Sequence, residues 1–244
     1  LMEKMIRDNQ FQDMLAIPLL YAGFHTPITE FDCGNRCAPY NKYRVPFCCD
    51  TRYAVPTAYL EEWNYLRIET DLWHPWQADT VEETKRLRDE TPPNQILIEC
   101  LGHQLCQRNY RTLTCRAFPF FPYIDQRGFF IGLAYYWQYA EQCWVINHLE
   151  AVSMEYIDSF VQTYDQIFQL LPNEKEQFRY HSKIMRQVFG RRKQLIPLLH
   201  RDGDLIAADT RTGKLNKITP DELPKFGPYN IPASLRFSDE IYER

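Results

Sequence analysis

The sequence predicts an α+β protein: an irregular, cysteine-rich core with short strands, followed by a helical segment and a small β-meander. All eight cysteines lie between positions 33 and 143, in segments with little hydrophobic periodicity. Residues 144–244 contain no cysteine and begin with apolar side chains at three- and four-residue spacing, typical of an amphipathic helix. We therefore expect a cysteine-cluster domain over 1–148, with the helical pair and meander of 149–244 packed on it.

Composition and charge restrict the class of protein. Hydrophobic residues make up 45% of the 244 and charged residues 25%, which indicates a globular chain rather than a disordered one. A net charge of -4 gives no reason to expect a nucleic-acid partner. The apolar runs are shorter than the roughly 20 residues that span a bilayer, and residues 1–7 lack the apolar core of a secretory signal. We expect no membrane contact and a cytoplasmic location, where reduced cysteines serve as metal ligands more often than as disulfides.

Turn residues and helix signals organise the first half. Glycine, asparagine and proline make 31–50 a loop held by its cysteines. Thr57 is typical of an N-cap for a helix through Arg67, and a second, charged helix is expected over 80–90. The run 95–99 predicts a short strand that leads into Cys100.

The second half shows clearer periodicity. An aromatic, β-branched run over 128–137 predicts a buried strand. Helices are expected over 150–171 and 174–189, with Pro172 ending the first and Asn173 capping the second. Turn signals between 195 and 218 predict the β-meander.

The cysteines carry the chemistry. Thiolates bind zinc or the iron of iron–sulfur clusters, and seven of the eight thiols lie in two loop-rich groups with little core of their own. Spacing alone allows one four-thiolate site with spare thiols, a larger shared cluster or two sites, and any single cysteine can instead be a small buried residue. The candidate metal ligands are Cys33, Cys37, Cys48, Cys49, Cys100, Cys106, Cys115 and Cys143.

Basic side chains surround the second group of cysteines. Arg111 and Arg116 flank Cys115, where they are candidates to bind a cofactor, to lower a thiolate pKa or to offset cluster charge. The alternative is two solvated surface arginines. His103 is the histidine placed between ligand candidates, and a polar turn residue is the alternative for it.

The order of these features resembles a known family. Spaced cysteines ending in a Cys-Cys pair precede a short hydrophobic strand and a Thr-x-x-x-Glu helix start, here Thr57–Glu61. Two further cysteines precede Tyr110, then Arg111-Thr-Leu-Thr-Cys115-Arg116 and Phe118-Pro-Phe120. This order over 31–148 resembles the YkgJ family, described as a zinc- or iron-chelating cysteine-cluster domain. The chain departs from the pattern in the ten residues between Cys37 and Cys48 and in Thr112, where proline is usual.

The resemblance implies a metal-binding protein with an iron–sulfur cluster, such as [4Fe–4S], or zinc. The family includes flagellin lysine methylases, which implies one alternative: an enzyme that uses a cluster and S-adenosylmethionine (SAM) to modify a protein substrate. Another alternative is a structural zinc module whose helical half binds a partner protein. Because no G-x-G pattern occurs, a Rossmann fingerprint is excluded, and whether the chain is an enzyme stays open.

Overall fold

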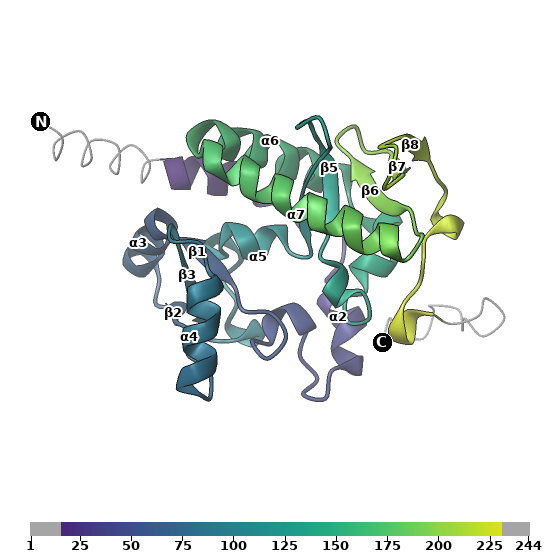
Figure 1. Cartoon of the computed structure of the whole chain (residues 1–244). Coiled ribbons are helices and arrows are strands. Elements are labelled where there is room, and N and C mark those ends of the chain that lie inside the picture. Colours follow the sequence, from purple (N-terminus) through teal and green to yellow (C-terminus); the bar gives the residue numbers. More distant parts are fainter. Residues whose placement is uncertain (1–15, 231–244) are drawn as a thin grey trace, which may run out of the picture.

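The computed structural model describes residues 16–230 and has two antiparallel sheets with helices packed around them (Figure 1). The smaller sheet has the strand order β1-β3-β2, formed by β1 (Thr57–Tyr59), β3 (Gln95–Cys100) and β2 (Trp73–Pro75). The larger sheet has the order β4-β5-β6-β7-β8 and comprises β4 (Phe120–Ile124), β5 (Phe130–Tyr135), β6 (Ile196–His200), β7 (Leu205–Ala208) and β8 (Leu215–Lys217). The predicted α+β class is confirmed. Among the described helices, none combines the length and the apolar character needed to cross a membrane.

In the first half of the chain, α4 (Val81–Glu90) begins where the sequence predicts, and α3 (Leu60–Glu69) begins later than predicted. At the start of α4, the Thr80 hydroxyl accepts a hydrogen bond from the Glu83 amide at 3.2 Å. α3 begins after Tyr59, so the prediction of Thr57 as its N-cap is wrong. Residues 57–59 pair with β3 instead, because strand pairing satisfies their backbone groups there.

The helices of the second half also differ from prediction at their starts. α6 (Met154–Leu170) begins after Ser153, whose hydroxyl accepts a hydrogen bond from the Tyr156 amide at 3.2 Å. Residues 145–151 form short 3₁₀ turns rather than a helical start. α7 (Pro172–Arg191) includes the expected break, Pro172, in its first turn, where a missing N–H costs nothing.

The larger sheet joins the two halves of the chain. The predicted meander is confirmed as β6–β8, but β6 also pairs with β5, with Leu133 opposite Leu199. At Gly132 a Cβ would clash with the Leu199 carbonyl oxygen, so the pairing of β5 with β6 requires glycine at this position. β4 was not expected as a strand. The boundary at residue 148 stays a prediction, and this sheet contains strands from both sides of it.

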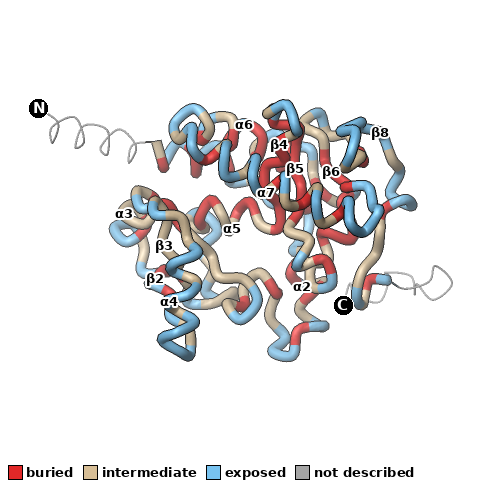
Figure 2. The backbone as a smooth tube through the Cα atoms, viewed as in Figure 1, coloured by how far each residue is buried: buried red, intermediate tan, exposed pale blue. Residues whose placement is uncertain are grey.

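The core lies between the larger sheet and the last two helices. α7 packs on β4 and on α6, and Figure 2 shows buried residues gathered along β4, β5 and α6, whereas no residue of α4 is buried. Phe160 and Tyr156 of α6 are fully buried. The Tyr156 hydroxyl donates to the carbonyls of Arg116 and Ala117 at 3.0 Å each, which ties α6 to the segment that follows Cys115.

Candidate metal centre

Polar side chains shape the loop that carries Cys48 and Cys49. Asp50, only 4% exposed, accepts hydrogen bonds from Asn41 Nδ2 at 3.0 Å and from Arg52 Nε at 2.6 Å. The Asp50 carbonyl also accepts the amides of Tyr53 and Ala54, at 2.8 and 3.1 Å. One buried aspartate therefore closes the turn that follows the cysteine pair.

The second group of cysteines follows β3. Cys100 is the last residue of that strand, and two 3₁₀ turns, His103–Leu105 and Arg108–Tyr110, lie on either side of Cys106. Cys115 lies in the short helix α5 (Leu113–Ala117). The Thr112 hydroxyl caps α5 by accepting the Cys115 amide at 3.0 Å, a role that proline does not fill.

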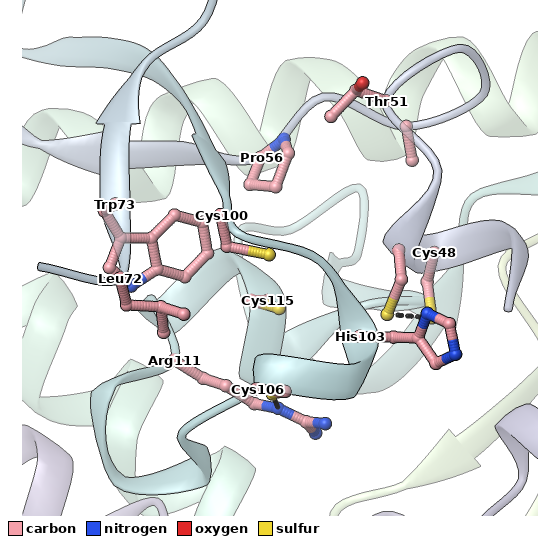
Figure 3. A pocket seen from close by; sticks show the side chains of 12 residues that line it. Cys48, Thr51, Pro56, Leu72, Trp73, Cys100, His103, Cys106, Arg111 and Cys115 are labelled. Atoms are coloured by element: carbon pink, nitrogen blue, oxygen red, sulfur yellow. Dashed lines mark hydrogen bonds between the residues drawn. The ribbon is translucent and has the colours of Figure 1, made fainter. Parts of the chain in front are cut away.

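These two loops meet at a small cavity of about 40 Å³ (Figure 3). β2 supplies an apolar wall through Trp73, whose indole N–H donates to the Tyr110 carbonyl at 2.7 Å. Arg111 and His103 also line the cavity, so His103 lies beside thiols. Five of the eight candidate ligands share this cavity: Cys48, Cys49, Cys100, Cys106 and Cys115.

The spacing of one thiol pair matches a shared metal. The sulfurs of Cys48 and Cys49 are 4.0 Å apart. Two thiolates bound to tetrahedral zinc at about 2.3 Å lie roughly 3.8 Å from each other. No three His, Cys, Asp or Glu side chains within residues 16–230 are arranged to hold a metal ion. The soft donors of this cavity fit zinc or an iron–sulfur cluster, and a closed centre requires further thiols to turn toward this pair.

The remaining thiols lie outside the cavity wall. Cys37, the end of the one-turn helix α2 (Gly34–Cys37), packs with Phe47 and Tyr229 in a separate small cluster. Burial, together with the smaller effect of the nearby thiols of Cys33 and Cys37, raises the pKa of Cys143 to about 12. The structure therefore places Cys33, Cys37 and Cys143 near one another.

Burial also keeps most of the metal-free thiols protonated. It raises the pKa of Cys115 to about 12 and that of Cys33 to about 11. Cys49 is the exception, because a hydrogen bond from Cys48 lowers its pKa. Metal binding to this group therefore requires the release of protons.

The two arginines have different surroundings. Arg111 Nε donates to the Cys106 sulfur at 3.1 Å. Burial lowers the pKa of Arg111. The neighbouring thiols, of which Cys115 has the largest effect, outweigh burial, so the pKa of Arg111 is raised overall. Arg116 is 8% exposed, and its guanidinium donates to backbone carbonyls of Tyr21, Phe24, Asn109 and Arg111. Arg111 therefore faces the thiols, whereas Arg116 joins the helical segment 16–23 to the cysteine loop.

A second, larger cavity of about 410 Å³ adjoins the first, and Cys48 and Cys115 line both. Its wall includes Glu174 and His181 of α7, neither of which the sequence singled out as a site residue. Glu174 shows only the ordinary acidic preference of a first helical turn, and His181 has no spacing that relates it to the cysteines. No local signal identifies them.

Comparisons with protein-family models, with curated proteins and with solved structures found no match to this chain.

Proposed function

We propose that this protein binds a metal centre, an iron–sulfur cluster or zinc, through thiolates from both cysteine loops, as the resemblance to the YkgJ family implies. The observation that carries the proposal is the meeting of five thiols from segments 50 residues apart at one cavity. All eight cysteines are free thiols, so none is used in a disulfide.

The surroundings of the cavity suit an anionic thiolate centre. Four thiolates around one metal or cluster leave excess negative charge, which is costly in a buried site without a counter-charge. Arg111 supplies that charge beside Cys106 and cannot lose its proton at physiological pH. Trp73 and Leu72 limit water access, and so favour a stable centre over an exchangeable one.

Anaerobic purification followed by metal and labile-sulfide analysis and a visible spectrum tests this proposal. We expect bound metal that is reduced at least severalfold in Cys100→Ser and Cys115→Ser. Thr51→Ala is the matched control, because Thr51 lines the same cavity and carries no sulfur. Colour with labile sulfide identifies a cluster, and colourless zinc-loaded protein selects the structural zinc module. Folded protein with neither metal nor sulfide overturns the proposal.

A second candidate is an enzyme that uses the cluster with SAM to modify a protein. The larger cavity supports it, because a ligand there lies beside Cys48 and Cys115. Equilibrium dialysis of SAM against metal-loaded protein tests it. We expect saturable binding that disappears in Cys115→Ala, and metal-loaded protein that retains no SAM counts against an enzyme of this type.

A further inference from the structure

The larger cavity has the size and the walls of a small-molecule site. Its volume of about 410 Å³ lies within the range of about 300–1,000 Å³ typical of ligand pockets. Segments far apart in the chain build it, from β1 through α5 and β4 to α7. Seven phenylalanine and tyrosine side chains line it: Tyr59, Phe118, Phe120, Tyr136, Tyr139, Tyr164 and Phe178.

The cavity has an acidic wall. Glu174 is the single carboxylate among the described residues that line it, and none of those residues is a lysine or an arginine. Glu174 is 2% exposed and is held by the Tyr59 hydroxyl at 2.9 Å and by Asn94 Nδ2 at 3.0 Å. These neutral donors position the carboxylate without cancelling its charge. The cavity therefore favours a cation over a neutral or anionic ligand of the same shape.

The aromatic walls of the cavity also favour a cation. Ring faces carry a negative quadrupole potential and attract organic cations when water is excluded. The imidazole of His181 also lines the cavity, and its Nε2 is buried without a partner within residues 16–230. Its ring packs edge-on against Phe121 and Tyr136, at 4.6 and 5.4 Å between centroids.

We infer that this cavity binds an organic ammonium ion, with its charge toward Glu174 and its apolar part among the aromatic rings. This inference goes beyond metal binding and does not depend on which metal the thiols hold. Because Cys48 and Cys115 belong to both cavities, the bound ammonium compound lies next to the thiol group.

Calorimetry with three ligands of nearly equal shape tests the inference on the full chain, purified anaerobically. The probes are benzylammonium, benzyl alcohol and benzoate, which differ mainly in their charge at neutral pH. We expect benzylammonium to bind about tenfold more tightly than the alcohol or better, and benzoate to bind most weakly. Equal affinity of ammonium and alcohol, a preference for benzoate, or no binding of benzylammonium overturns the inference.

Two variants test whether the Glu174 carboxylate causes the preference for the cation. Glu174→Gln keeps the shape of the side chain, and we expect it to reduce benzylammonium affinity to that of the alcohol. Glu176→Gln is the matched control, because it makes the same charge change on the same helix at a side chain that is 68% exposed. Equal effects of the two variants contradict the assignment. If Glu174→Gln does not fold, the three ligands on the natural protein still decide the inference.

Discussion

Glu62 is a buried carboxyl whose titration we expect to affect the stability of this protein. It lies in α3 with no exposed surface and accepts the Tyr21 hydroxyl at 2.7 Å and the Leu113 amide at 2.6 Å. The Leu113 amide begins α5, so Glu62 supports the helix that carries Cys115. Burial raises the pKa of Glu62 from 4.5 to about 7, although these hydrogen bonds favour the carboxylate.

The direction of the effect follows from proton linkage. Between the two pKa values the folded state keeps a proton that the unfolded state has lost, so stability falls as pH rises. The contribution of Glu62 is fully present below pH 4.5 and is lost as pH rises through about 7. At about 1.4 kcal/mol per pH unit, this interval corresponds to about 3 kcal/mol of unfolding free energy.

Urea unfolding of the natural protein and Glu62→Gln, at intervals from about pH 4 to about pH 8, measures this contribution. We expect the difference in unfolding free energy to shift by about 3 kcal/mol in favour of the variant as pH rises. Other titrating groups, such as His181, cancel in that difference. Glu69→Gln, which makes the same change at an exposed position of the same helix, is the control. Parallel pH profiles for the natural protein and Glu62→Gln would refute the reasoning.

Three further changes follow from the same structure. Arg116→Met leaves several buried carbonyls without donors, and we expect about 3 kcal/mol less stability by urea unfolding; a loss under about 1 kcal/mol contradicts this. Phe160→Ala opens a hole among the rings of Phe24, Tyr156 and Tyr164, so unfolding free energy should fall by about 3–5 kcal/mol, and a near-neutral result means that α6 repacks. Arg111→Gln removes a charge-assisted hydrogen bond to Cys106, and loss of metal to a chelator should be about tenfold faster. Arg108→Gln, at an arginine that is 55% exposed, is its control, and equal rates for the two variants exclude the proposed role of Arg111.

Local chemistry explains which elements were predictable. The Thr80 cap and the acidic first turn identify α4, and turn signals such as Asp202-Gly203 identify the meander, because each effect acts within a few residues. The start of α3 could not be predicted in this way. Thr57 has the character of an N-cap, but pairing of residues 57–59 with β3 depends on a segment 38 residues further along the chain.

The candidate site also has features that the sequence indicates and features that only the fold decides. Loop composition and the expectation of a reducing compartment make the cysteines candidate metal ligands from sequence alone. Which arginine faces the thiols could not be read from spacing, because Arg111 and Arg116 both lie within four residues of Cys115. The orientation of α5 decides it, turning Arg116 toward the carbonyls of the segment 16–24 and leaving Arg111 beside Cys106.

The sequence by itself determined the α+β class, the helices α4, α6 and α7 and the two thiol-bearing loops, since periodicity, capping and turn chemistry are local properties. Tertiary structure alone decided that five thiols share one cavity and that Glu174 and His181 lie beside it. The physical reason is that α7 reaches this cavity only by packing on β4 and α6. Burial of apolar surface between those distant elements places an acid and an imidazole where no spacing along the chain could indicate them.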